Sequence, residues 1–256
     1  MKRICTIFAA ALLMPVLFSS CAQAKVKNYV LQVVNSYPHD RTSYTQGLFF
    51  HDGQMYESTG LNGKSTFRKV DIATGKALSR LNFDRKYFIE GSVEKDGKIF
   101  ILTWENNLAF IYDAATLQYR SSYSYPREGW GLTTDGKYLI ASDGSSRLYF
   151  MDDTFNVKKT LTVKLEGRQV SLLNELEYID GRIWANVYLS DLIVIIDPET
   201  GNVTATVDCS GLLPRNLRDR DTDVLNGIAY NPADGRIYLT GKNWCRLYEV
   251  KTVEKK

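Results

Sequence analysis

Residues 47–57 read Gly-Leu-Phe-Phe-His-Asp-Gly-Gln-Met-Tyr-Glu, and this stretch decides the fold. Two short apolar segments flank the dipeptide Asp52-Gly53. Asp-Gly between two such segments is a strong signal for a β-hairpin, because both central residues of a type I′ turn need positive φ. The stretch therefore predicts two antiparallel strands joined by a tight turn.

The same hairpin pattern occurs five times, at spacings of 44, 39, 45 and 54 residues. The turns lie at Asp52-Gly53, Asp96-Gly97, Asp135-Gly136, Asp180-Gly181 and Asp234-Gly235. A third strand follows each hairpin, as at 65–71 and 108–113, and a fourth leads outward, as at 76–81. Four strands in units of about 40 to 45 residues are typical of the blades of a β-propeller.

The two ends of the chain support five blades. The last unit stops after its third strand, Arg246 to Val250, whereas Tyr29 to Asn35 is an unclaimed strand before the first hairpin. That N-terminal strand can close the last blade and hide sheet edges that would otherwise aggregate. We predict a single all-β domain over residues 25–256, a five-bladed β-propeller with four-stranded blades. A β-sandwich with similar hairpins is the alternative.

Composition and charge are those of a packed globular protein. Aromatic residues make up 12% of the 256 residues, and the formal net charge of +3 comes from 32 basic and 29 acidic side chains. So balanced a charge does not predict a nucleic-acid-binding surface. We expect no nucleic-acid partner and a monomeric protein.

Residues 1–24 have the pattern of an export signal. Two basic residues precede an apolar run from Ile4 to Phe18, which is too short to span a membrane but typical of a secretory signal. Small residues before Cys21 allow lipoprotein cleavage there, with a lipid anchor on that cysteine, and Ala22-Gln23-Ala24 allows cleavage before Lys25. We expect export to the periplasm or cell envelope, with both cleavage sites open.

Two cysteines, Cys209 and Cys245, lie in the body of the chain. In an oxidising compartment they could form a disulfide. Two buried free thiols are the alternative, because separation in sequence says nothing about distance in space.

Each predicted blade brings a polar side chain to the start of its innermost strand, and in a propeller these starts converge on one face. The segments are Tyr44-Thr45-Gln46-Gly47-Leu48, Phe88-Ile89-Glu90-Gly91-Ser92, Glu128-Gly129-Trp130-Gly131-Leu132, Asn174-Glu175-Leu176-Glu177 and Leu225-Asn226-Gly227-Ile228. Trp104, Trp130 and Trp184 lie in or just beyond successive segments and are expected to line one pocket. Core packing of Trp104 and Trp184, and a structural role for Glu90, are the alternatives.

Several chemistries are excluded by what the sequence lacks. His39 and His51 are the only histidines, and neither a Cys-x-x-Cys nor a His-Glu-x-x-His pattern occurs, so no metal site is predicted. The sequence also has no Gly-x-Ser-x-Gly elbow and no phosphate loop. We expect chemistry from carboxyl, amide, lysine and tryptophan side chains, with no cofactor.

Taken in order, these segments resemble the glutamine cyclotransferase family of the plant and bacterial type, from Tyr37 to Val250. Three further stretches share the resemblance: Leu102-Thr103-Trp104, Ile183-Trp184-Ala185-Asn186 and Thr240-Gly241-Lys242-Asn243-Trp244. Each is weak alone, but one or more per blade in this order is specific. The resemblance implies a five-bladed propeller that needs no metal.

The resemblance also implies an activity, glutaminyl-peptide cyclotransferase, which closes an N-terminal Gln of a peptide to pyroglutamate and releases ammonia. By the same resemblance Glu90 is the acid/base residue, with Gln46, Asn174 and Lys242 as its polar companions. The walls implied for the site are Trp104, Trp130 and Trp184, and the other predicted substrate-binding residues are Tyr44, Phe88, Ile89 and Asn226.

One carboxyl group suffices for this chemistry, because nucleophile and amide carbon belong to the same substrate. The carboxyl takes a proton from the attacking amine and passes it to the leaving nitrogen, help that is worth about 10² to 10⁴ in rate. Two other classes stay open. A carboxylate glycosidase would need a second carboxyl, Glu128 or Glu177, opposite Glu90. A surface propeller could bind a peptide without forming a product.

Overall fold

The computed structural model describes residues 25–255, so the predicted leader and Cys21 lie outside the described residues. Within this range the chain consists of strands β1 to β22 and one short 3₁₀ turn, η1 (Arg215–Leu217). The predicted all-β class is confirmed. No helix of the described range is long and apolar enough to cross a membrane.

Three sheets each hold four consecutive strands, and every neighbouring pair in them is antiparallel. The first consists of β2 (Thr45–His51), β3 (Gln54–Thr59), β4 (Thr66–Asp71) and β5 (Lys76–Asn82). The second consists of β6 (Ile89–Lys95), β7 (Lys98–Thr103), β8 (Leu108–Asp113) and β9 (Tyr119–Ser124). The third consists of β10 (Leu132–Thr134), β11 (Leu139–Ser142), β12 (Arg147–Met151) and β13 (Val157–Thr162). A two-stranded hairpin follows, made of β14 (Lys164–Leu165) and β15 (Arg168–Gln169).

The remaining strands form one eight-stranded sheet in the order β16-β17-β18-β19-β1-β22-β21-β20. Its strands are β16 (Leu173–Ile179), β17 (Arg182–Val187), β18 (Leu192–Ile196), β19 (Val203–Asp208), β1 (Lys27–Pro38), β22 (Arg246–Glu254), β21 (Arg236–Gly241) and β20 (Leu225–Asn231). The N-terminal strand β1 runs antiparallel to the last strand, β22, and its first residues run parallel to β19.

The hydrogen-bonded sheets therefore differ from the five separate four-stranded sheets that the sequence predicts. The reason is the length of β1, which has 12 residues. Its segment from Tyr29 to Pro38 pairs with β22, while Lys27 to Val30 pairs with β19 of the preceding unit. One strand thus joins the last two units into a continuous sheet.

The predicted turn geometry holds in three of the five hairpins. Both residues have positive φ at Asp52-Gly53, Asp96-Gly97 and Asp180-Gly181. At Gly136 and Gly235 only the glycine does. These two turns lie in four-residue connections, at 135–138 and 232–235, and such loops are most often built around a type I turn.

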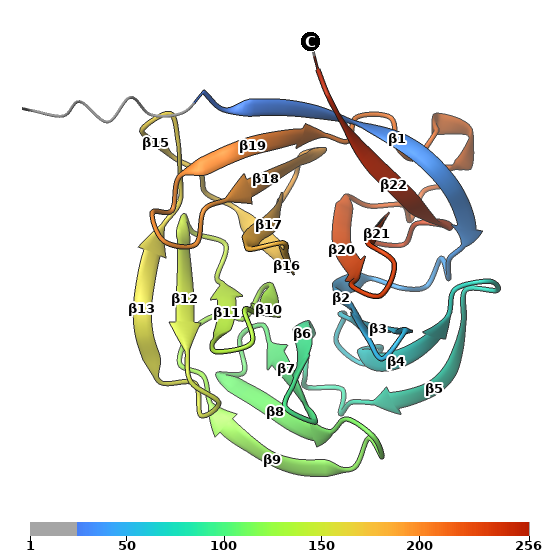
Figure 1. Cartoon of the computed structure of the whole chain (residues 1–256). Coiled ribbons are helices and arrows are strands. Elements are labelled where there is room, and N and C mark those ends of the chain that lie inside the picture. The colour runs from blue at the N-terminus through green and yellow to red at the C-terminus, as the bar shows by residue number, and fades with distance from the viewer. Residues whose placement is uncertain (1–24, 256) are drawn as a thin grey trace, which may run out of the picture.

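The sheets surround a common centre, with the first strand of each unit innermost (Figure 1). Innermost strands contact one another in a closed cycle, β2 to β6, β10, β16, β20 and back to β2. Apolar side chains fill the space between sheets, and successive residues of one strand pack on opposite faces. Phe100 packs toward the third sheet, whereas Ile99 and Ile101 pack toward the first. This arrangement brings the starts of all innermost strands to one end of the ring.

The structure has no disulfide between Cys209 and Cys245. Both are free thiols, as in the other alternative that the sequence left open. Both contact the apolar cluster beneath the eight-stranded sheet. Burial raises the pKa of the Cys209 thiol, which makes this residue a packing element rather than a reactive group.

Candidate active site

A cavity of about 230 Å³ lies where the innermost strands begin. All five repeat units contribute to its lining. The lining residues are Tyr44, Gln46, Phe88, Glu90, Trp104, Trp130, Asn174, Tyr188 and Lys242. Eight of these nine belong to the residues predicted from the sequence, and Tyr188 is the addition.

The innermost strands are irregular where they deliver these side chains. The strand pairing shifts register between Thr45 and Gly47, Ile89 and Ser92, Leu173 and Leu176, and Leu225 and Ile228. Such a bulge leaves a residue unpaired and re-aims its side chain. Gln46, Glu90 and Asn174 lie within these shifts and line the cavity, which explains how β-strands can turn polar groups toward the ring's mouth. Asn226 lies within the fourth shift.

Glu90 is the buried acid of the cavity. Glu90 is only 5% exposed, and its Oε1 accepts a hydrogen bond from Gln46 Nε2 at 3.0 Å. Burial raises the pKa of Glu90 well above its usual value, the Lys242 ammonium opposes this, and the Glu128 carboxylate adds to it. A carboxyl group with a raised pKa can both accept and donate a proton near neutral pH.

Lys242 supplies a positive charge to the cavity from the last unit, which lies on the other side of the first unit from Glu90. Its Nζ lies 4.7 Å from the centroid of the Tyr44 ring and 5.0 Å from that of Tyr188, within the range of a cation–π interaction. Burial lowers the pKa of Lys242, while the charges of Glu90 and Asp223 oppose the shift. An ammonium held between two rings beside an acid can stabilise developing negative charge.

Five aromatic side chains surround the cavity and are called the aromatic wall here: Tyr44, Phe88, Trp104, Trp130 and Tyr188. Neighbours meet edge to face. The ring centroids lie 6.3 Å apart for Tyr44 and Phe88, and 5.5 Å apart for Phe88 and Trp104. Trp130 meets Tyr188 at 5.5 Å in the same way. Lys242 bridges Tyr188 and Tyr44, so the wall continues across the last unit.

Glu128 joins the two indoles of the aromatic wall. Its Oε2 accepts hydrogen bonds from Trp104 Nε1 at 2.9 Å and from Trp130 Nε1 at 3.0 Å. One exposed carboxylate thus fixes the orientation of both rings relative to each other.

Gly60 leaves the space that Phe88 occupies. A Cβ atom at Gly60 would lie 2.3 Å from the Phe88 ring, which no real contact allows. Any larger residue at this position would displace the Phe88 ring, which is part of the aromatic wall.

Three predicted substrate-binding residues lie away from the cavity. Ile89 is fully buried in the apolar cluster between the first two sheets. Asn226 lies behind Gln46, where its Nδ2 donates to Gln46 Oε1 at 3.3 Å. Trp184 packs in the core beneath the eight-stranded sheet. For Trp184 the alternative of core packing is correct, and its prediction as a wall of the site is wrong.

The reason for the error at Trp184 is its distance from the hairpin turn. Trp104 comes seven residues after the turn glycine Gly97, whereas Trp184 comes three after Gly181. The position that corresponds to Trp104 is Tyr188, the residue missed by the sequence analysis. Counting seven from every turn glycine finds Gly60, Trp104, Asp143, Tyr188 and Lys242. Three of these line the cavity, so this count is the signal that was available.

The cavity does not offer the pair of facing acids that a glycosidase needs. Among the described residues that line it, Glu90 carries the only carboxyl group. Glu177 lines a different cavity, near the ends of the same strands, and Glu128 is bound to two indoles. Across residues 25–255 no group of three or more His, Cys, Asp or Glu side chains is placed to hold a metal ion.

Fold and cavity together define an all-β protein with one protonatable acid in an aromatic pocket, and comparison with known proteins gives its family. The chain matches the family described as glutamine cyclotransferase over residues 6–252. A glutaminyl-peptide cyclotransferase of Arabidopsis thaliana is 42% identical over 226 residues, which are 86% of this chain and 71% of that protein. The crystal structure of Myxococcus xanthus glutaminyl cyclase superposes with a TM-score of 0.85 at 34% identity, covering 91% of this chain and all of that one. The chain belongs to the glutamine cyclotransferase family.

Proposed function

We propose that this protein is a glutaminyl-peptide cyclotransferase, which converts the N-terminal Gln of peptides or proteins to pyroglutamate and releases ammonia. Its relatives carry that activity in their names. The observation that supports it best is the buried Glu90 carboxyl, with its raised pKa, inside the aromatic wall. A cavity of about 230 Å³ is below the roughly 300–1,000 Å³ of sites for drug-sized ligands, which suits one amino-acid residue better than a longer segment.

The reaction needs one proton to move between two nitrogens of the same substrate. The neutral α-amine attacks the side-chain amide carbon, and a carbon–nitrogen bond forms while negative charge develops on the amide oxygen. The Glu90 carboxylate takes a proton from the attacking nitrogen and then gives it to the amide nitrogen, which leaves as ammonia. Glu90 ends as a carboxylate again, so protons balance, and its raised pKa suits both transfers.

The other polar groups of the cavity bind and orient the substrate in this scheme. Lys242 and the Gln46 amide carry the positive charge and the N–H donors that can stabilise the oxyanion. Asn174 Oδ1 is buried and has no hydrogen-bond partner within residues 25–255. A buried acceptor without a partner is costly, so we assign it to an N–H group of the bound glutamine.

The direct test is ammonia release from a Gln-Xaa peptide by the purified protein, with and without EDTA, followed by mass spectrometry of the peptide. We expect the loss of one ammonia per peptide and no effect of EDTA. A peptide that stays unchanged while it binds would instead identify a non-catalytic binding protein.

We also infer that the five repeat units are the blades of a propeller. Three sheets correspond to one unit each, and the eight-stranded sheet divides into β16–β19 and into β20–β22 with β1. The closed cycle of innermost strands supports this interpretation. Since all five units of one chain line the cavity, we propose that the protein acts as a monomer.

Export and anchoring are proposed from the sequence of residues 1–24. Cleavage before Cys21 would give a lipid-modified N-terminus, and cleavage before Lys25 would give a free one. The mass of the mature N-terminal peptide from cell-envelope fractions distinguishes the two.

A further inference from the structure

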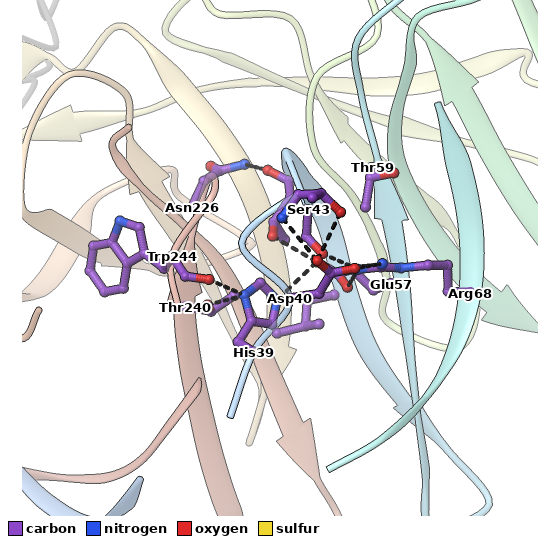
Figure 2. A network of polar contacts seen from close by, with 12 residues as sticks. His39, Asp40, Ser43, Glu57, Thr59, Arg68, Asn226, Thr240 and Trp244 are labelled. Carbon is purple, nitrogen blue, oxygen red and sulfur yellow. Dashed lines mark hydrogen bonds and ion pairs between the residues drawn. The ribbon is translucent and has the colours of Figure 1, made fainter. Parts of the chain in front are cut away.

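A group of charged side chains, buried except for the partly exposed Asp40, lies where the first unit meets the last (Figure 2). We call it the Glu57 cluster, and it consists of His39, Asp40, Glu57 and Arg68. Glu57 is 1% exposed and Arg68 is 6% exposed. None of the four lines the cavity, and the reaction scheme above makes no use of them.

Glu57 is the branch point of the cluster. Its Oε1 accepts hydrogen bonds from His39 Nε2 at 3.1 Å and from Thr45 Oγ1 at 2.7 Å, and its Oε2 accepts one from Arg68. Arg68 also donates to Asp40 Oδ2 at 2.8 Å. Although burial opposes it, the positive charges of Arg68 and His39 hold the pKa of Glu57 well below its usual range.

His39 faces an acceptor at each ring nitrogen. Nε2 meets the Glu57 carboxylate, and Nδ1 lies 2.7 Å from the carbonyl oxygen of Trp244. Both contacts are satisfied only when both nitrogens carry a proton, so the imidazolium is the form that fits. Burial alone would lower the pKa of His39, but the Glu57 carboxylate raises it above its usual value.

One branch of hydrogen bonds leads from Glu57 to the catalytic acid. Thr45 donates to Glu57 through its hydroxyl and accepts Asn226 Nδ2 at its carbonyl at 2.9 Å. The same Asn226 Nδ2 lies 3.3 Å from Gln46 Oε1, and Gln46 Nε2 donates to Glu90 at 3.0 Å. Because Asn226 occupies the oxygen of the Gln46 amide, the nitrogen of that amide is directed at Glu90.

A second branch leads from the Glu57 cluster to Lys242. His39 holds the carbonyl of Trp244, and the carbonyl of Ser43, whose hydroxyl is bound by Arg68, accepts the Asn243 N–H at 2.7 Å. Asn243 and Trp244, whose backbones are held in this way, follow Lys242 directly in the turn from Gly241 to Trp244. The turn is compact, because a Cβ at Gly241 would lie 2.3 Å from the Trp244 ring.

Charges buried in this way need an explanation other than stability. Apolar side chains of the same volume often stabilise a fold as well as a buried ion pair or better. Within residues 25–255 two atoms of this network, Arg68 Nε and Asn226 Oδ1, are buried without a partner. The hydrogen bonds that the network does make favour one arrangement of its parts, because another would leave further buried groups without partners. In this network the parts are the strand that carries Gln46 and the turn that carries Lys242.

We propose that the Glu57 cluster is a positioning site for the reaction, which sets Gln46 and Lys242 relative to Glu90. This inference rests on the proposed function. The competing view is that the cluster only joins the first and last units of the ring.

The test uses two variants and a matched control. His39→Gln keeps a polar side chain but cannot donate to Glu57 and to Trp244 at once, and Thr45→Val removes only the hydroxyl that reaches Glu57. The control is Glu249→Gln. Glu249 is another buried carboxylate at the junction of the chain ends, where it accepts the Tyr37 hydroxyl at 2.9 Å and faces Arg236 at 3.6 Å.

We expect His39→Gln to lower kcat about 10- to 100-fold with a smaller change in KM, since a shift of about 1 Å at a catalytic group can cost about 10². Thr45→Val has a smaller effect of the same kind. Glu249→Gln lowers the melting temperature and leaves kcat unchanged. In His39→Gln the acidic limb of the kcat/KM profile moves to higher pH, because the Lys242 ammonium, which lowers the pKa of Glu90, is displaced.

Amide hydrogen exchange of residues 241–244 gives a readout that needs no activity. Faster exchange in His39→Gln but not in Glu249→Gln supports the proposal. Wild-type kcat and an unchanged pH profile in both variants, or equal losses in the control, overturn it. If His39→Gln does not fold, Thr45→Val decides by the same criteria. If the wild-type protein releases no ammonia, the proposed function fails, and exchange alone then decides whether the cluster holds the turn.

Discussion

The two ends of the ring each hold a buried glutamate on an innermost strand, and the two residues are bound very differently. Glu90, on β6, accepts a hydrogen bond from a side-chain amide and lies in the cavity with the Lys242 ammonium. Glu177, on β16, accepts the Tyr230 backbone N–H at 2.9 Å and lines the second cavity near the strand ends. Burial raises the pKa of both, to about 8 for Glu177.

The difference shows that a raised pKa does not by itself identify a catalytic acid. Burial is the largest cause of the raised pKa at both glutamates, and at Glu90 the Glu128 carboxylate adds to it. What Glu90 has in addition is a pair of polar side chains, Gln46 and Lys242, that line the same cavity and interact with its carboxyl group. Glu177 is held by the Tyr230 backbone N–H and the Thr133 hydroxyl, and the residues described around its cavity include no Lys or Arg.

The largest effect on kcat/KM is expected when the two acids are removed one at a time. Glu90→Gln should lower kcat/KM for Gln-Xaa peptides by at least about 10²-fold, the range for loss of a general acid/base. Glu177→Gln should leave it unchanged. Both are measured by ammonia release, with circular dichroism to check folding. Equal losses in the two variants would break the comparison.

The second prediction concerns stability at the other end of the ring. The folded-state pKa of Glu177 is raised from 4.5 to about 8, so its proton is bound more tightly in the folded chain. The resulting stabilisation is complete below about pH 4.5 and is lost as pH rises toward 8, by up to about 1.4 kcal/mol per pH unit. Urea unfolding at pH 5 and pH 8 should show a smaller loss in Glu177→Gln than in the wild type. The same slope in both would contradict the assignment.

Removing the positive charge of Lys242 tests the feature that distinguishes the surroundings of Glu90 from those of Glu177. Lys242→Met keeps the volume and loses the charge, and we expect kcat to fall about tenfold or more through weaker stabilisation of the oxyanion. The acidic limb of the pH profile should also move upward, since Lys242 lowers the pKa of Glu90. A limb that stays in place would mean that the two charges do not interact.

The smallest effect is expected at the rim. Glu128→Gln keeps an oxygen that can accept both indole N–H groups but removes a negative charge that raises the pKa of Glu90. The acidic limb should therefore shift to lower pH by a few tenths of a unit, the scale of a screened surface charge, with kcat nearly unchanged. Tryptophan fluorescence of the variant reports whether the two rings have moved.

Local chemistry explains what the sequence predicts well. An Asp-Gly turn depends on its own two residues, so the hairpins at Asp52 and Asp96 can be predicted from a few neighbours. Because the hairpin repeats, the residues before each innermost strand fall at equivalent places, and Gln46, Glu90 and Asn174 are found together. Trp184 was predicted in the wrong place because it is a tryptophan like Trp104, although it lies at a different distance from its turn glycine.

Contacts between distant parts of the chain explain what the sequence does not predict. The parallel pairing of β1 with β19 depends on where a long strand ends relative to its partners. From the sequence, His39 bears only on the absence of a predicted metal site. Its partners Glu57 and Trp244 lie 18 and 205 residues away, and no local pattern relates them.

The position of β1 has a consequence for how the molecule is made. Its partners, β19 and β22, begin at Val203 and Arg246, so β1 cannot form these pairs until strands far behind it in the chain have been synthesised. Contacts so far apart in sequence make folding slow. A chain shortened by its final strand would leave β1 without its longest ladder and β21 as a bare edge, ready to pair with another molecule.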